Sequence, residues 1–371
     1  MNFLRLGSRD FLKAVRPFVG LFVVLTLFAI VMDGEISSKF FSGRTFKTIL
    51  AQTVIVAIGA MGMTLVIVSG GIDLSAGSVV ALCSVVTAKL IVLGHGFVPS
   101  LNSAISAEWT SGLVMYLLQV ICFIVFAVLI GGLVGMASGG IITAFRMMPF
   151  IVTLGMMGIA RGITKWVAKN VSVTPEEPLE SINRLMDISQ SPKTFFPLPD
   201  GVWLTLGLAV VMAVVLRSTL FGRYVFAIGS NEDTARLCGI RVNLNKVVIY
   251  TLAGAFFGLA GLMQFSRLTQ GDPSVAIGLE LKIIAAVVIG GASLSGGVGS
   301  IPGSVIGAFM MACLDSGSIM IGWPNYVQEI IIGVVIILAV GMDKVEPFIQ
   351  RLFKRQSSSN RPTLGQAGGA V

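Results

Sequence analysis

Residues 48–72 read TILAQTVIVAIGAMGMTLVIVSGGI, a stretch of apolar and small residues without a charged side chain. A helix of roughly 20 apolar residues crosses the bilayer core of about 30 Å, so this stretch is long enough to span a membrane. The other long uncharged apolar runs are 17–32, 109–145, 201–216, 247–266 and 283–314. Two of them, 109–145 and 283–314, hold nearly two spans each. The sequence therefore predicts an all-α, polytopic membrane protein.

The composition excludes other classes. Of 371 residues, 55% are hydrophobic and 12% charged, with a mean hydropathy of +0.91. Soluble domains carry roughly 25% charged residues, so this chain cannot coat a water-facing globule. The net charge of +8 would suggest a nucleic-acid partner in a soluble protein, but here the basic residues flank apolar runs and indicate membrane topology. The four scattered cysteines and single histidine predict neither a metal site nor a disulfide framework.

We expect about ten membrane-spanning helices, with glycine-broken segments between some of them. The predicted spans are 17–33, 48–69, 76–94, 112–137, 148–168, 201–217, 246–265, 281–295, 300–321 and 325–342. The first follows a basic N-terminus like that of a signal peptide, but no cleavage site follows it, so we interpret it as an uncleaved helix. Residues 1–345 then form one transmembrane domain. Residues 346–371, rich in serine and glycine, form a disordered cytoplasmic tail.

Basic residues orient these spans. Residues 1–16, residues 217–246 and the tail from Asp343 each carry a net charge of +3, which predicts that all three are cytoplasmic. The long segment 169–200 carries a net charge of −2 and should lie outside. Segment 33–47 fits less well, because it should be external yet is basic.

A glycine-containing motif occurs twice. Gly70-Gly71-Ile72-Asp73-Leu74-Ser75 is followed about 220 residues later by Gly290-Gly291-Ala292-Ser293-Leu294-Ser295. Each lies between two apolar runs, where a helix must break. Paired glycine-interrupted segments in the two halves of a transporter commonly border the translocation path. The alternative is a generic turn that arose twice.

Charges inside apolar runs are energetically costly and therefore informative. Lys89, Lys165 and Lys282 lie near span ends, where we expect them to extend to the membrane interface. Arg161 lies deeper and either bonds carbonyl groups at a helix end or lines a polar cavity. Asp73 either accepts hydrogen bonds from N–H groups at the start of the next helix or contacts substrate. Further acids in or beside apolar runs are Glu280, Asp315 and Glu329.

No motif for catalysis is present. The chain contains no G-x-x-x-x-G-K-[ST] loop, no H-E-x-x-H and no G-x-S-x-G. We therefore predict a protein that is not an enzyme and that has no cofactor of its own.

The segment 221–240 predicts a short cytoplasmic helix. Asn231 is a favourable N-cap, two acidic residues follow it, and Gly239 suits the helix stop. Ala235 and Leu237 would need a partner surface. An ordinary interhelical loop is the alternative.

Three motifs together resemble the permease subunits of bacterial ATP-binding-cassette importers for ribose, xylose, galactose and related monosaccharides. They are Gly71-Ile72-Asp73-Leu74-Ser75-Ala76-Gly77-Ser78, Gly229-Ser230-Asn231 with Ala235-Arg236-Leu237-Cys238-Gly239-Ile240, and Ala285 to Gly297. The resemblance covers about residues 45–345. The part from Met311 looks most like xylose permeases. Cys238 and Lys282 depart from the family pattern.

The resemblance implies a homodimeric or pseudo-dimeric pore in the bacterial inner membrane, driven by two cytoplasmic ATPase domains that bind ATP and Mg²⁺. A periplasmic sugar-binding protein would deliver the substrate, and no nucleic acid is involved. For the translocation path or its structural motifs we predict Gly71, Asp73, Ser75, Arg161, Gly290, Gly291, Ser293 and Ser295. For coupling to the ATPase we predict Gly229, Asn231, Ala235, Leu237, Gly239 and Ile240.

Two other functions stay open from the residues alone. A secondary transporter driven by a proton or sodium gradient would need buried acids or a histidine, and Asp73 and Glu329 are few for that role. A membrane scaffold would not need paired glycine-broken segments.

Overall fold

The described residues of the computed structural model are almost entirely helical. They are 21–93 except 23, 24 and 27, then 112–176, 179–188, 198–324, 326–334, 336, 337 and 341. The helices are α2 (Gly34–Phe40), α3 (Gly43–Val68), α4 (Ala76–Leu93), α6 (Gly112–Phe145), α7 (Pro149–Ala168), α8 (Glu180–Asn183), α9 (Asp200–Ser218), α10 (Leu220–Ser230), α11 (Glu232–Leu237), α12 (Val242–Leu268), α13 (Leu279–Ile289) and α14 (Ile301–Ile321). Residues 326–334 are also helical.

Seven of these helices are long and apolar enough to cross a membrane: α3, α4, α6 from Tyr116, α7, α9, α12 and α14. They match seven of the ten predicted spans. Parts of the predicted spans 17–33 and 325–342 lie outside the described residues, as do His95 and the tail 346–371. The remaining predicted span, 281–295, differs. Its helix α13 has 11 residues, which at about 1.5 Å per residue covers about half of a bilayer core.

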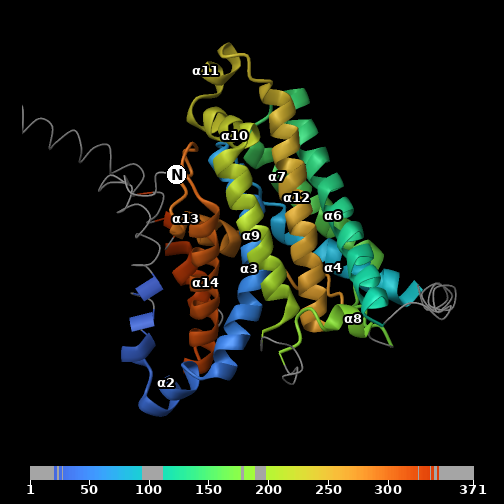
Figure 1. Ribbon diagram of the computed structural model, residues 1–371, viewed down its shortest axis with the longest axis vertical. Coiled ribbons are helices and arrows are strands. Elements are labelled where there is room, and N and C mark those ends of the chain that lie inside the picture. The colour runs from blue at the N-terminus through green and yellow to red at the C-terminus, as the bar shows by residue number, and fades with distance from the viewer. Residues whose placement is uncertain are drawn as a thin grey trace, which may run out of the picture.

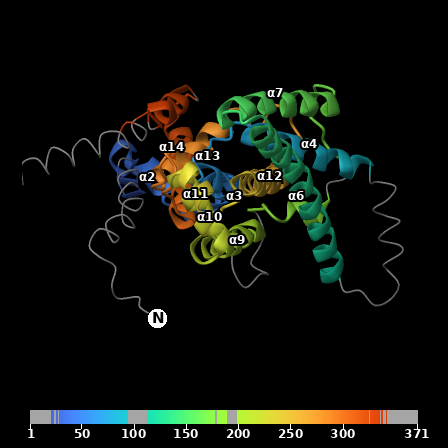
Figure 2. The same cartoon turned by 90° about the horizontal axis from the view of Figure 1, so that it is seen from above.

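The central helices are α3 and α12, around which the other long helices pack (Figures 1 and 2). In α3, 94% of the most apolar 18-residue stretch is buried within the protein, whereas in α6 and in α7 the corresponding share is 28%. The outer helices therefore present apolar faces suited to lipid, with exposed side chains such as Leu129, Ile159 and Val210.

Close packing between α6 and α12 depends on glycine. A Cβ added at Gly131 would lie 2.8 Å from Cα of Gly258, and one added at Gly254 would lie 2.9 Å from Cα of Gly135. Only a residue without a side chain lets the two backbones approach this closely. This packing agrees with the high glycine content of the sequence.

The bundle has two distinct ends (Figure 1). One carries α10 and α11, and we refer to it as the α11 end. The opposite end carries α2 and α8, the latter within segment 169–200. The described parts of segment 169–200 and segment 217–246 thus lie at opposite ends, as the predicted alternation of spans requires.

Candidate functional site

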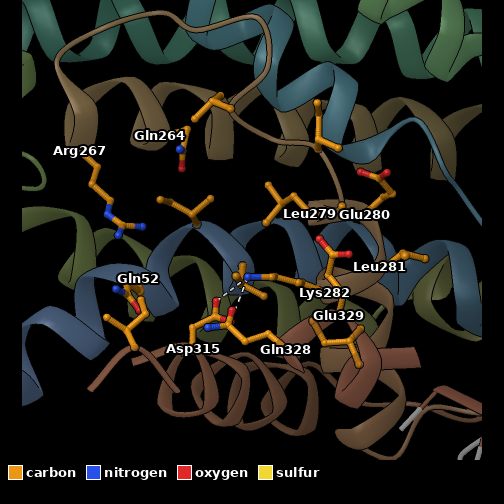
Figure 3. A pocket seen from close by; sticks show the side chains of 18 residues that line it. Gln52, Gln264, Arg267, Leu279, Glu280, Leu281, Lys282, Asp315, Gln328 and Glu329 are labelled. Atoms are coloured by element: carbon orange, nitrogen blue, oxygen red, sulfur yellow. Dashed lines mark hydrogen bonds and ion pairs between the residues drawn. The ribbon is translucent and has the colours of Figure 1, made fainter. Parts of the chain in front are cut away.

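A polar cavity of about 620 Å³ lies among α3, α12, α13, α14 and the helical residues 326–334 (Figure 3). Its polar and charged lining residues are Gln52, Gln264, Arg267, Glu280, Lys282, Asp315, Gln328 and Glu329. Aliphatic side chains, among them Ile55, Leu279 and Ile332, complete the wall. Since α3, α12 and α14 are membrane-spanning in length and composition, this cavity brings polar groups into an otherwise apolar bundle.

An ion pair connects two of the helices that form the cavity. Nζ of Lys282 in α13 lies 2.9 Å from Oδ1 and 2.8 Å from Oδ2 of Asp315 in α14. The two side chains are 28% and 19% exposed. The expectation that Lys282 extends to the membrane interface is therefore wrong. Its ammonium group instead turns into the cavity, where a carboxylate neutralises it.

Arg161 and Glu280 form a second, looser pair. Nη2 of Arg161 in α7 lies 4.0 Å from Oε1 of Glu280, which is the second residue of α13. Oε2 of Glu280 is buried and has no hydrogen-bond partner within the described part of the chain. A Cβ at Gly77 would collide with this oxygen, so Gly77 leaves the space that Glu280 occupies against the start of α4. Glu280 therefore lines the cavity, whereas its partner Arg161 does not.

Three glutamines line the cavity, and the sequence analysis did not single them out. Oε1 of Gln52 accepts a hydrogen bond from Oγ of Ser316, at 3.0 Å. Gln264 and Gln328 are 8% and 7% exposed. Nε2 of Gln328 makes no hydrogen bond to any described residue. A glutamine within an apolar helix was the sequence feature that could have indicated these residues. The sequence analysis considered only charged side chains in apolar runs and so did not find them.

Asp73 holds the loop between α3 and α4. Its Oδ1 accepts hydrogen bonds from the backbone N–H of Ser75, at 2.8 Å, and from the Ser75 hydroxyl, at 2.6 Å. The hydroxyl of Thr153 in α7 donates to the carbonyl oxygen of Ile72, at 3.2 Å. Asp73 is 1% exposed and is not part of the cavity lining. Of the two roles considered for it, this geometry favours organising the start of α4.

The two glycine motifs share a local interaction. The Asp73 side chain accepts from the N–H of Ser75, and at the equivalent positions Oγ of Ser293 accepts from the N–H of Ser295, at 3.2 Å. Their glycines differ, since positive φ occurs at Gly70 in the first motif and at Gly291 in the second. The two motifs therefore share a turn closed by a side-chain hydrogen bond, but their backbones follow different paths.

Glycines from three segments meet at the α11 end, at what we call the glycine junction: Gly70, Gly229 of α10, Gly296 and Gly297. The N–H of Gly297 donates to the carbonyl of Val68, the last residue of α3, at 2.8 Å. A Cβ at Gly229 would collide with that carbonyl, and one at Gly296 would lie 3.0 Å from Cα of Gly70. The junction thus joins α10 to the loops that follow both α3 and α13.

Helix α11 has the predicted ends. Oδ1 of Asn231 accepts a hydrogen bond from the N–H of Thr234, at 2.8 Å. At the other end Gly239 has φ +81°, and the N–H of Ile240 donates to the carbonyl of Ala235, at 3.1 Å. These bonds satisfy backbone groups that a helix of six residues leaves open at both ends.

The two faces of α11 differ sharply. Leu237 is 88% exposed, so it is free to contact a partner. Ala235 is 3% exposed and packs with Ile228 of α10 and Val242 of α12, with Ile240 partly buried against them. The expectation that Ala235 needs a partner surface is therefore corrected, because the protein itself covers this residue.

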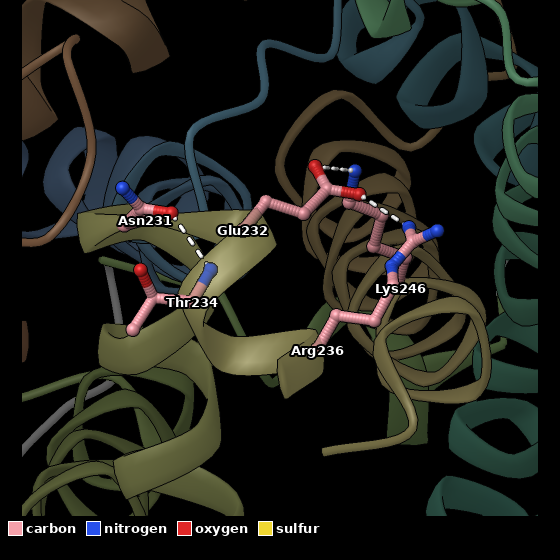
Figure 4. A network of polar contacts seen from close by, with 5 residues as sticks. All are labelled: Asn231, Glu232, Thr234, Arg236 and Lys246. Carbon is pink, nitrogen blue, oxygen red and sulfur yellow. Dashed lines mark hydrogen bonds and ion pairs between the residues drawn. The ribbon is translucent and has the colours of Figure 1, made fainter. Parts of the chain in front are cut away.

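An acidic side chain ties α11 to α12 (Figure 4). The carboxylate of Glu232 accepts from Nζ of Lys246 in α12, at 2.6 Å, and from Nη2 of Arg236, at 3.2 Å. The Lys246 side chain is 17% exposed. A displacement of α11 would consequently act on α12 as well as on α10.

These features together define a class: a polytopic α-helical membrane protein with a half-length helix, glycine-broken loops and an internal polar cavity, as in transporters. Residues 45–340 match the family described as the permease component of branched-chain amino acid transport systems. The match covers most of the chain, so the protein belongs to this family. The resemblance to permease subunits seen in the sequence is confirmed.

Curated relatives are similar over nearly their full length. The ribose import permease protein RbsC of Escherichia coli strain K12 is 36% identical over 346 residues, covering 91% of this chain and 97% of the relative. RbsC of Bacillus subtilis strain 168 is 34% identical, with 90% and 93% covered. The L-arabinose ABC transporter permease protein AraH of Azospirillum brasilense is 31% identical, with 85% and 84% covered. No solved structure matches the chain.

Proposed function

We propose that this protein is the permease subunit of an ATP-driven importer and carries a monosaccharide across the inner membrane. The relatives named above are import permeases for ribose and arabinose, and the similarity covers nine-tenths of this chain for RbsC. ATP hydrolysis would take place in a separate ATPase, and a periplasmic binding protein would deliver the sugar.

One observation carries the coupling part of this proposal: α11 presents an exposed leucine and is physically tied to the helices around the cavity. Leu237 is available on the outside, while Glu232 and the glycine junction connect the segment to α12, α3 and the loop after α13. An ATPase that moves α11 would therefore shift the elements on which the cavity depends. In this arrangement the α11 end faces the cytoplasm, with both chain termini on the same side.

The family description mentions branched-chain amino acids, so the substrate class needs a separate argument. A branched aliphatic side chain is best bound by an apolar pocket, and free ammonium and carboxylate groups need unpaired charges as partners. The cavity offers three glutamines, and Lys282 and Asp315 are already bonded to each other. Two other charged lining residues, Arg267 and Glu329, are exposed rather than buried as a charge pocket. This chemistry favours a solute with several hydroxyl groups.

A second copy of the chain would complete the path. Arg161 in α7, Lys282 in α13 and Glu329 in the helix 326–334 all retain exposure beside the cavity. Charged groups in a membrane-spanning region avoid lipid and face a water-filled path or a partner. We therefore propose that a homodimer forms across the face between α7 and residues 326–334.

The test is reconstitution of the permease in proteoliposomes with its cognate ATPase and binding protein, which are to be sought among the neighbouring genes. We expect ATP-dependent uptake of ribose, arabinose or xylose and sugar-stimulated ATP hydrolysis. Leucine and valine should not be transported. Uptake that requires an ion gradient instead of ATP, or transport of leucine alone, would overturn the proposal.

A further inference from the structure

We propose that the cavity is a binding site of the permease itself for one uncharged polyhydroxyl molecule, with Gln264 and Gln328 as its specificity-determining contacts. This inference rests on the proposed function and adds to it. Selection of the substrate would then occur a second time inside the membrane, after delivery by the binding protein.

The first argument is unmet hydrogen bonding. Both side chains are more than nine-tenths buried and line the cavity. Within the described part of the chain, Nε2 of Gln328 is buried without a hydrogen-bond partner, and Gln264 lines the same cavity. Buried amide groups in proteins are almost always satisfied, by protein, water or ligand. These two are therefore positioned to bond a molecule that occupies the cavity.

The second argument is the kind of group that fits. A carboxamide offers donors on nitrogen and an acceptor on oxygen, and a sugar hydroxyl is both donor and acceptor. One glutamine can bond two neighbouring hydroxyls. Gln264 comes from α12 and Gln328 from the helix 326–334, so the two amides approach the cavity from different helices (Figure 3). A bound molecule would bridge these helices.

The third argument is charge. The two charged pairs at the cavity, Lys282 with Asp315 and Arg161 with Glu280, each sum to zero. The other charged lining residues, Arg267 and Glu329, are exposed and lie apart in the view of Figure 3. They also balance each other in formal charge. With Arg161 included, these six groups sum to zero, so a solute with a net charge would lose hydration without a net electrostatic gain, whereas a neutral polyhydroxyl solute can replace its hydration by hydrogen bonds to the amides.

The volume agrees with these arguments. About 620 Å³ lies within the range of roughly 300–1,000 Å³ that small-molecule sites occupy. A monosaccharide would leave room for bridging water molecules. The aliphatic wall, which includes Ile55, Leu279 and Ile332, suits the C–H faces of a sugar ring.

The experiment pairs single variants with substrate analogues that each lack one hydroxyl. ATP-driven uptake is measured in the reconstituted system for the transported sugar and for its deoxy analogues, with Gln264→Leu and Gln328→Leu. We expect each variant to lower kcat/KM for the full sugar at least tenfold. We also expect each to become indifferent to the removal of one particular hydroxyl, which the unsubstituted protein should discriminate against.

Thr251→Val is the matched control. It removes one hydroxyl from the same helix as Gln264, but the Thr251 hydroxyl bonds only within α12, to the carbonyl of Val247 at 2.8 Å, and does not line the cavity. Its uptake and selectivity should equal those of the unsubstituted protein. Co-purification with the ATPase reports folding, and Gln264→Met and Gln328→Met, which keep the side-chain length and remove the amide without adding a charge, replace any leucine variant that fails to fold.

The outcomes separate this inference from the proposed function. If the unsubstituted protein does not transport sugar with ATP, the proposed function fails. If it does, the ratio of kcat/KM for each deoxy analogue to that for the full sugar is compared between proteins. If this ratio is the same in the glutamine variants as in the unsubstituted protein, the binding site is refuted while the proposed function stands.

Discussion

At the scale of single residues, the cavity depends on charges that neutralise each other across helices. Lys282 and Asp315 are each only partly exposed, and each compensates the other. Removing one partner of such a pair leaves a charge without its counter-ion. Replacing both by apolar residues of similar size is often neutral or stabilising.

This predicts opposite effects for single and double variants. Asp315→Leu alone should lower the stability of the protein by up to about 3 kcal/mol, the low end for a buried pair because both side chains retain some contact with solvent. Lys282→Met combined with Asp315→Leu should recover most of the apparent melting temperature in detergent. A double variant as unstable as the single one would show that the pair does not act as a unit.

Asp73 gives a second residue-scale prediction. Asp73→Ala removes the acceptor for the Ser75 N–H and hydroxyl, a loss comparable to that of a helix cap, about 0.5–2 kcal/mol. We expect reduced yield of monodisperse protein and reduced uptake. Asp73→Asn retains an oxygen acceptor and should be milder. Wild-type yield and uptake for Asp73→Ala would show that the residue is dispensable.

At the scale of elements, the glycine junction requires that two loops and α10 remain in backbone contact. Gly229→Ala would force a methyl group onto the Val68 carbonyl. Overpacking of this kind typically costs about 1–3 kcal/mol. We expect a lower melting temperature and weaker stimulation of ATP hydrolysis by sugar. Gly207→Ala in α9 is the control, because a Cβ there meets nothing within 4 Å and should be tolerated.

Helix α11 gives the sharpest prediction at this scale. Leu237→Asp should leave the protein inserted and folded, because the side chain is 88% exposed and supports no internal contact. Association with the ATPase and uptake should be lost, since an unpaired charge in an interface that excludes water is strongly unfavourable. Co-purification measures the association. Normal co-purification and uptake of Leu237→Asp would refute α11 as the docking element.

The elements also show what sequence can and cannot predict. The ends of α11 follow from Asn231 and Gly239, which lie within a few residues of the backbone groups they serve. By contrast, the Lys282–Asp315 pair joins residues 33 positions apart through the turn after α13, and no local pattern contains it. The burial of Ala235 likewise depends on α10 and α12. The short length of α13 was hidden because its apolar run continues into α14, although Gly290-Gly291 marked the break.

At the scale of the whole molecule, the seven long helices agree with the predicted spans, but their orientation in the membrane is a proposal. The chain contains a natural reporter for it, because Cys238 follows α11 directly and is exposed. Val171, at the start of the loop that leads to α8, is also exposed.

A membrane-impermeant maleimide should therefore label Cys238 in inverted vesicles but not in intact spheroplasts. In a Cys122→Ser and Cys238→Ser background, Val171→Cys should show the reverse pattern. These residues lie at opposite ends of the bundle, so labelling of both from the same side would indicate a rearranged fold. Labelling of Val171→Cys only from the inside would invert the proposed topology.

The burial of α3 has a consequence for how such a protein can change over evolutionary time. Nearly every side chain in the most apolar 18 residues of α3 meets protein, and a Cβ added at Gly59 or Gly62 would already press on Ile283 or Phe256. Lipid, by contrast, accommodates any apolar side chain on the outer faces of α6, α7 and α9. Selection should therefore hold α3 almost fixed while the outer helices drift among leucine, isoleucine, valine and phenylalanine. New substrate preferences would then arise by exchanges on the other elements that border the cavity, α12, α13, α14 and residues 326–334, while α3 hardly varies.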